Sequence, residues 1–155
     1  MKEIKGIIVP ILTPMQADES VCYEELVRQI ERMINAGMHG IFVFGTNGEG
    51  YILSYEEKCK ILETTVRTVN GRVPVYAGTG CISTAETIRL SRQAKELGAD
   101  VLSIITPSFA AASQQELQRH YETVAEAVDL PILLYNIPAR TGNALAPDTV
   151  QALSR

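Results

Sequence analysis

The sequence lacks the features of membrane, secreted or nucleic-acid-binding chains. No apolar stretch in its 155 residues approaches the roughly 20 residues that a membrane-spanning helix needs. The segment 1–6 has no apolar core of a secretory signal, so we expect no leader peptide. The net charge is −4, and no run of lysine and arginine interleaves with aromatic residues, which argues against a nucleic-acid partner.

Cysteine is scarce and is not arranged for a structural role. The chain has only Cys22, Cys59 and Cys81, an odd number with no zinc-binding spacing. This usage predicts free thiols, a cytoplasmic location and no metal site.

The composition is that of an ordinary globular domain. Apolar residues make up 46% and charged residues 21%, and the length is sufficient for a core of its own. No low-complexity linker divides the chain. We therefore expect residues 1–155 to belong to one domain.

A strand–helix unit of about 30 residues repeats along the chain. The predicted strands are short apolar runs without alternation, as in parallel strands buried on both faces: 6–12, 40–44, 73–77, 101–105 and 132–135. A serine followed three residues later by a glutamate predicts a capping box at three helix starts: Ser54 and Glu57, Ser83 and Glu86, Ser113 and Glu116. Glycines 37, 71 and 98 follow the first three predicted helices, where a left-handed cap favours glycine.

Two α/β architectures use this repeat. Five units could form a five-stranded doubly wound sheet. They could also form the first part of an eight-fold barrel, whose full length is typically about 250 residues. Periodicity does not distinguish the two, but in both the functional sites lie at the carboxyl ends of the strands.

The segment 45–49 follows the second predicted strand and has the composition of an anion cradle. Its glycines, Gly45 and Gly48, let the backbone turn and expose N–H groups, while Thr46 and Asn47 add side-chain donors. The alternative is a tight turn without a ligand.

A second polar strand end, 135–142, favours a site. Tyr135 could exchange a proton with Thr46 through a short hydroxyl hydrogen bond, and Arg140 could hold a substrate carboxylate with two parallel hydrogen bonds. The alternatives are an amphipathic core tyrosine and a solvated arginine in a loop.

Taken in chain order, these motifs resemble the dihydrodipicolinate synthase/N-acetylneuraminate lyase family of pyruvate-dependent class I aldolases. The resemblance rests on Thr13-Pro14, Gly45–Glu49, Leu53–Glu57, Ala77–Gly80, Thr106-Pro107 and Tyr135–Gly142. It implies a (β/α)8 TIM barrel, usually assembled as a homo-oligomer (a tetramer or a dimer of dimers), without a cofactor. Residues 1–155 would be an incomplete barrel domain with strands 1 to 5, lacking the C-terminal strands.

The resemblance also implies the chemistry and the roles of the site residues. In the family a lysine forms a Schiff base with pyruvate, and the resulting enamine attacks an aldehyde such as aspartate semialdehyde, a step of lysine biosynthesis. Thr46, with Gly45 and Asn47 of its loop, would hold the pyruvate carboxylate. Tyr135 would shuttle the proton, and Arg140 would bind the acid group of the second substrate.

The sequence departs from the family pattern in three ways. The Schiff-base lysine of the family lies at the end of the sixth strand, beyond Arg155. None of the lysines present is expected to replace it: Lys58, Lys60 and Lys95 are helical, and Lys2 and Lys5 precede the first strand. The chain is therefore expected to be inactive alone. Where the synthases have a pair of tyrosines after Thr-Pro, this chain has Ser108-Phe109. Asn47 stands where the family usually has a second hydroxyl residue after Thr46. These changes keep open another pyruvate-dependent aldolase, of the 2-keto-3-deoxy sugar acid or N-acetylneuraminate type, and a non-catalytic half-barrel fragment.

Overall fold

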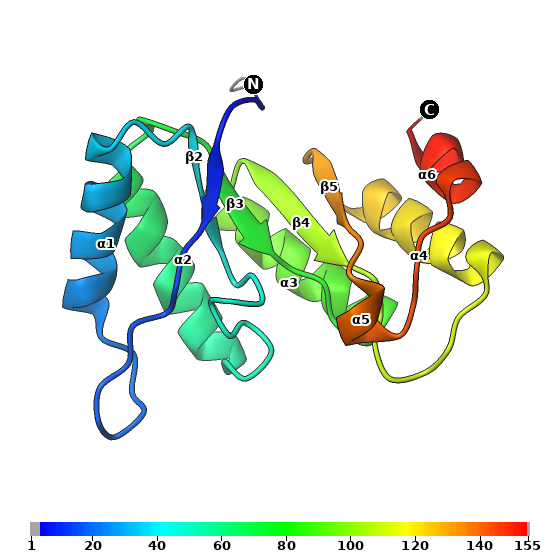
Figure 1. The fold of residues 1–155 in the computed structure, drawn as a ribbon, viewed down its shortest axis with the longest axis horizontal. Helices are drawn as coiled ribbons and strands as arrows, with labels where there is room; N and C mark the ends of the chain where they lie inside the picture. The colour runs from blue at the N-terminus through cyan, green and yellow to red at the C-terminus, as the bar shows by residue number, and fades with distance from the viewer. Residues whose placement is uncertain (1–3, 155) are drawn as a thin grey trace.

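The computed structural model describes residues 4–154, in which strands and helices alternate along the chain (Figure 1). In order, the elements are β1 (Ile8–Pro10), α1 (Tyr23–Asn35), β2 (Gly40–Val43), α2 (Tyr55–Val69), β3 (Val75–Gly78), α3 (Thr84–Glu96), β4 (Val101–Ile105), α4 (Gln114–Ala127), β5 (Ile132–Tyr135), α5 (Pro138–Thr141) and α6 (Pro147–Leu153). All five predicted strands are present, and β4 and β5 have the predicted bounds. Within residues 4–154, no helix combines the length and apolarity needed to cross a bilayer.

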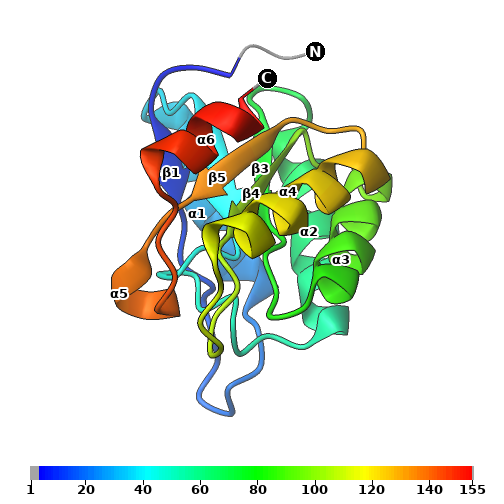
Figure 2. The same ribbon diagram turned by 90° about the vertical axis from the view of Figure 1, so that its right-hand side faces the viewer.

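The order of the strands decides between the two predicted architectures. The sheet runs β1-β2-β3-β4-β5, and every neighbouring pair is parallel. A doubly wound sheet reverses its strand order at a switch point, whereas a barrel adds strands in sequence. Helices α1 to α4 lie on one side of the sheet, as Figures 1 and 2 show together. The five strands therefore form an arc of a barrel with its helices outside.

The two faces of the sheet carry different side chains, because successive residues of a strand point to opposite faces. The outer face packs on the helices in the main core, which includes Ile41, Ala77 and Leu102. The inner face carries a smaller cluster of Phe42, Tyr76 and Val101, with Ile8 and Tyr135 packed against it. In a closed barrel this inner face is the interior.

The helix boundaries follow the sequence signals with one exception. Ser54 and Ser113 each form the complete capping box, and glycines 37, 71 and 98 have the positive φ expected after a helix. Ser83 accepts a hydrogen bond from the Glu86 N–H, but the Glu86 carboxylate meets only the Ser83 hydroxyl, at 3.5 Å. The prediction of a full box at Ser83 is therefore wrong: φ of Ser83 is −104°, whereas φ is −62° and −70° at the two complete boxes, so the backbone at Ser83 has a different geometry.

Candidate active site

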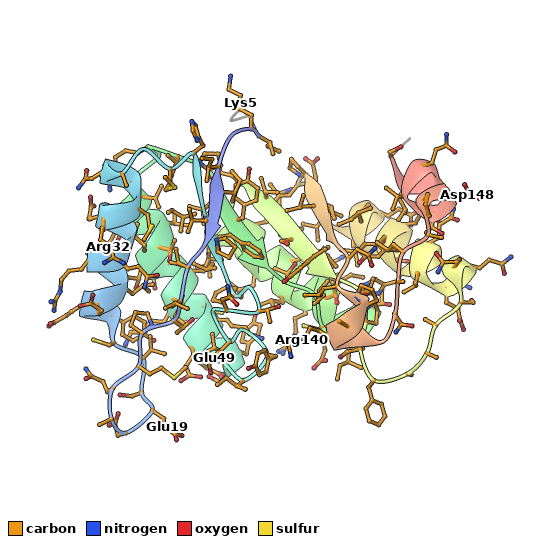
Figure 3. The ribbon with its side chains drawn as sticks, in the orientation of Figure 1. Lys5, Glu19, Arg32, Glu49, Arg140 and Asp148 are labelled. Atoms are coloured by element: carbon orange, nitrogen blue, oxygen red, sulfur yellow. The ribbon has the colours of Figure 1, made fainter. Side chains whose placement is uncertain are left out.

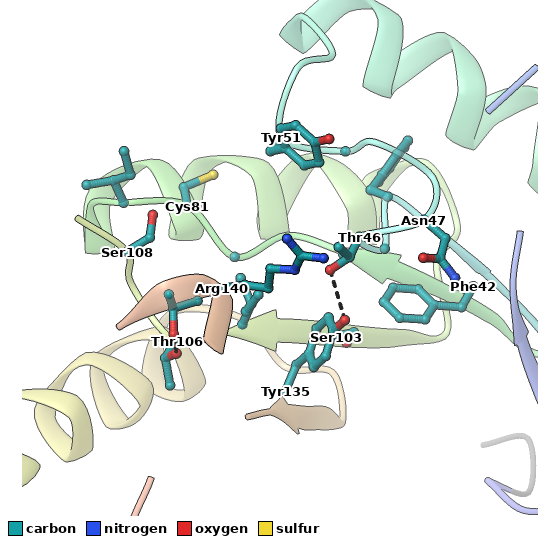
Figure 4. Close-up of a pocket in the computed structure, with 18 of the residues that line it drawn as sticks. Phe42, Thr46, Asn47, Tyr51, Cys81, Ser103, Thr106, Ser108, Tyr135 and Arg140 are labelled. Carbon is teal, nitrogen blue, oxygen red and sulfur yellow. Dashed lines mark hydrogen bonds between the residues drawn. The ribbon is translucent and has the colours of Figure 1, made fainter. Parts of the chain in front are cut away.

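A cavity of about 750 Å³ lies at the carboxyl ends of β2 to β5 (Figure 4). We call it the strand-end cavity. All five predicted site residues line it: Gly45, Thr46, Asn47, Tyr135 and Arg140. The prediction that these residues meet at one place is therefore confirmed, although 89 positions separate Thr46 from Tyr135.

A hydrogen bond joins the two sides of the strand-end cavity. The hydroxyl groups of Thr46 and Tyr135 lie 2.9 Å apart, and either can donate. The Tyr135 ring also packs edge to face on Phe42, with ring centroids 6.4 Å apart. Because β3 and β4 stand between β2 and β5 in the sheet, only the curvature of the arc allows this contact.

Crowding around one carbonyl group fixes the loop that carries Thr46. Phe44 has φ of +65°, a left-handed conformation that is uncommon for a bulky residue. An added Cβ at either Gly50 or Gly78 would lie 2.5 Å from the Phe44 carbonyl oxygen, so only glycine fits at these two positions. The Thr13 hydroxyl donates to the Gly48 carbonyl at 2.6 Å. Thr13 therefore supports the loop rather than lining the cavity.

Arg140 lies in the one-turn helix α5 instead of the predicted loop (Figure 3). Pro138 begins the helix and supplies a φ that suits a first turn, and Gly142 ends it with φ of +77°. Figure 4 shows the guanidinium directed toward Thr46. Arg140 forms no ion pair with any carboxylate among the described residues, so its charge is available to an anionic ligand.

A hydrogen-bonded network that the sequence did not reveal holds α5 against the loop after β4. The Asn143 side chain donates to the carbonyls of Pro107 and Ala110, each at 2.8 Å, and accepts from the Ala112 N–H. The Thr106 hydroxyl lies 2.7 Å from that of Thr141. An asparagine just after a left-handed glycine is only a turn signal in a sequence, and its distant partners depend on the fold.

The wall of the strand-end cavity also includes charged residues that were not predicted as site residues. Lys58 of α2 and Glu86 of α3 line it, beside Cys81. Burial raises the pKa of the Cys81 thiol above its usual value. Lys58, which is not expected to replace the Schiff-base lysine because it is helical, lines the cavity from the first turn of α2. No cluster of three or more metal-ligating residues occurs within residues 4–154.

Comparison with known proteins identifies the family. Residues 3–155 match the model of the dihydrodipicolinate synthetase family. The chain belongs to this family. It is 46% identical over 150 residues to the 4-hydroxy-tetrahydrodipicolinate synthase of Pelobacter propionicus, covering 97% of this chain and 51% of that relative. The corresponding enzyme of Alcanivorax borkumensis is 43% identical, with 98% and 52% covered.

The fold of this chain agrees with solved structures of the family. The dihydrodipicolinate synthase of Acinetobacter baumannii, complexed with pyruvate, superposes with a TM-score of 0.97 at 42% identity, covering 99% of this chain and 53% of that one. A prophage protein of the dihydrodipicolinic acid synthase family from E. coli K12, also with pyruvate, gives 0.93 at 40% identity, with 96% and 50% covered. The chain spans about half the length of the curated relatives it matches, and its five strands form a half-barrel.

Proposed function

We propose that these residues form part of a pyruvate-dependent lyase of the 4-hydroxy-tetrahydrodipicolinate synthase type. The observation that carries the proposal is the convergence of Thr46, Tyr135 and Arg140 on the strand-end cavity. The names of the relatives and the pyruvate complex of the Acinetobacter enzyme support it. In this proposal residues 1–155 supply the first five strands of the barrel, and the Schiff-base lysine belongs to the sixth.

The cavity offers separate sites for the two acids that such a condensation joins. The Thr46 hydroxyl and the glycine-rich backbone around Gly45 and Asn47 bind the pyruvate carboxylate, since donors at a turn recognise an anion. The guanidinium of Arg140 binds the carboxylate of the aldehyde, for which its planar fork is suited. Each acid is therefore oriented by its own group of donors.

Tyr135 moves the proton in the proposed mechanism. Its hydroxyl accepts a hydrogen bond from Thr46 or donates one to it over 2.9 Å, a distance suited to proton transfer. The edge-to-face contact with Phe42 fixes the ring. When pyruvate is bound as a lysine imine, the imine acts as the electron sink, and Tyr135 carries the proton between the reacting atoms and Thr46.

We further propose a cytoplasmic homo-oligomer that needs no cofactor. The three cysteines are free thiols in the structure, which suits a reducing compartment. Phe109, at the tip of the loop after β4, is 98% exposed, and a large apolar side chain in that state suits burial against a second subunit.

Reductive trapping tests the proposed function. The protein expressed from its natural gene is treated with pyruvate and borohydride beside the 155-residue chain, and the adduct is located by peptide mass spectrometry. We expect an adduct on the former and none on the latter. The variant Lys58→Met is the control, because Lys58 lines the cavity. An adduct on the 155-residue chain that disappears in Lys58→Met would refute our placement of the lysine, and no adduct on either protein would refute the lyase.

A second candidate function is a pyruvate-dependent aldolase that acts on another aldehyde. Ser108-Phe109 favours it, because phenylalanine cannot carry a proton where the synthases have a tyrosine. The test compares condensation of pyruvate with aspartate semialdehyde against cleavage of a 2-keto-3-deoxy sugar acid and of N-acetylneuraminate. A kcat/KM highest for either cleavage reaction would replace the synthase with this second function.

A further inference from the structure

Ser103 has a buried hydroxyl group without a hydrogen-bond partner. The residue lies in the middle of β4 and is 2% exposed, and its Oγ meets no donor or acceptor in the part of the chain that the structure describes. Buried side-chain hydroxyls are normally satisfied, because an unmade hydrogen bond is costly. The buried Ser91 behaves normally, since it donates to the Thr79 hydroxyl at 2.8 Å.

The register of the sheet places Ser103 on the inner face. Ser103 pairs with Gly78 of β3 and with Leu133 of β5, and it lies two residues beyond Val101, a member of the inner cluster. Gly78 has no side chain, and the side chains of Leu133 and Val101 have no polar atom. These neighbours cannot satisfy the hydroxyl.

The same residue lines the strand-end cavity. Ser103 shares the cavity wall with Thr46, Tyr135 and Arg140, and in Figure 4 it is seen behind the Tyr135 ring. It lies two residues before Ile105, which pairs with Tyr135, so it is one layer deeper in the arc than the Tyr135 backbone. The unpartnered hydroxyl is therefore at the base of the cavity.

We propose that Ser103 is a substrate-binding residue whose hydroxyl donates a hydrogen bond to an oxygen atom of the small 2-oxo acid in the cavity. The inference rests on the proposed function, which supplies the 2-oxo acid. The hydroxyl turns about a single side-chain bond, so it can meet an oxygen that enters from the cavity side. Thr46 and Arg140 bind the substrate carboxylates in the strand-end cavity, and Ser103 adds a hydrogen-bond donor at its base. A hydrogen bond at this depth favours an oxygen-bearing substrate over a hydrocarbon chain of equal size.

Pyruvate titration of serine variants tests this role. Isothermal titration calorimetry gives the dissociation constant of pyruvate for the protein expressed from its natural gene and for Ser103→Ala, Ser103→Cys and Ser91→Ala. We expect about tenfold weaker binding in Ser103→Ala, the effect of losing one hydrogen bond to a charged ligand, without a lower thermal midpoint. Ser103→Cys keeps the volume and should bind as weakly. Ser91→Ala should lower the thermal midpoint and leave the dissociation constant unchanged.

The outcomes separate this inference from the proposed function. If the unsubstituted protein binds pyruvate and Ser103→Ala binds it within twofold, the role of Ser103 is refuted and the proposed function stands. Full affinity in Ser103→Cys would also refute it, because volume rather than the hydroxyl would then be the cause. Failure of the unsubstituted protein to bind pyruvate would refute the proposed function, and the role of Ser103 with it.

Discussion

At the scale of single residues, the threonines that follow the strands serve different purposes. Thr13 supports the Gly48 carbonyl, Thr79 accepts from Ser91, and Thr106 pairs with Thr141. The Thr46 hydroxyl instead meets Tyr135 across the strand-end cavity. The same residue type at the same place in the repeat therefore serves structure at three strand ends and the proposed chemistry at one.

The hydroxyl of Tyr135 can be removed while its ring stays in place. In Tyr135→Phe we expect kcat of the proposed reaction to fall about a hundredfold or more, the contribution of a positioned acid–base group, at little cost in stability. Steady-state kinetics of Tyr135→Phe, Thr46→Val and the double variant measure it. The double variant should be no slower than Tyr135→Phe, because the two hydroxyls act as one unit.

The control for this prediction is Tyr121, a buried phenol that does not line the cavity. Tyr121→Phe removes a hydroxyl that donates to the Ile104 carbonyl at 3.1 Å, so it should cost stability and leave kcat unchanged. Independent, multiplicative losses in Thr46→Val and Tyr135→Phe would contradict a coupled pair.

His120 makes the stability of the fold depend on pH. It is 6% exposed between α3 and α4, with Nδ1 2.9 Å from the Thr84 hydroxyl, and burial lowers its pKa below 6.5. The folded chain therefore binds this proton less readily than the unfolded chain. The stabilisation is complete above about pH 6.5 and is lost as the pH falls toward the lower, folded-state pKa.

Urea unfolding between pH 7.5 and 5.5 measures this dependence. We expect the free energy of unfolding to fall below pH 6.5, and the fall to be smaller in His120→Gln. An unchanged slope in His120→Gln would show that another group titrates.

At the scale of elements, the loop after β2 depends on the strand beside it. Gly78 belongs to β3, yet its missing side chain is what leaves room for the Phe44 carbonyl. The position of Thr46 therefore depends on two neighbouring strands. In a sequence, glycine at a strand end indicates only a turn. At position 78 glycine is required because the backbone of Phe44 approaches closely.

Gly78→Ala tests this dependence. The added Cβ must displace the Phe44 carbonyl, so we expect the free energy of unfolding to fall by about 1–3 kcal/mol and pyruvate binding to weaken. At Gly37, with φ of +82°, an added Cβ meets nothing within 4 Å. Gly37→Ala should therefore cost about 1–2 kcal/mol of backbone strain and leave pyruvate binding unchanged. Equal affinities in the two variants would show that the loop does not depend on Gly78.

At the scale of the whole molecule, the half-barrel leaves two sheet edges open. Within residues 4–154, β1 and β5 each pair with one neighbour only, and Leu133 of β5 is 45% exposed. Open strand edges beside apolar side chains favour pairing with another chain. An arc of this kind is most stable when further strands cover both edges.

We therefore expect the 155-residue chain to self-associate. Sedimentation velocity should show species larger than a monomer, with a proportion that rises with concentration. Leu133→Lys should reduce the association, because an edge lysine opposes strand pairing. Val150→Lys, a substitution at a 39% exposed position on α6, is the matched control and should not. A monomer at every concentration would contradict the prediction.

The sequence alone determined the five strands, the four long helices and the end of the sheet at which the site lies, although not the one-turn helix α5. Continuous apolar runs predicted five buried parallel strands, and local serine–glutamate pairs predicted three capping boxes, of which two are complete, because these signals depend on neighbouring residues only. Parallel strands bring their carboxyl ends to one edge, so Gly45, Thr46, Asn47, Tyr135 and Arg140 could be expected to meet there.

Tertiary structure alone decided the strand order and which further side chains line the strand-end cavity. Nothing local placed Lys58 at the cavity wall or left the Ser103 hydroxyl unpartnered. Each of these depends on the curvature of the sheet and on atoms that are distant in sequence. Contacts of that kind are formed only when the packed strands bring the side chains together.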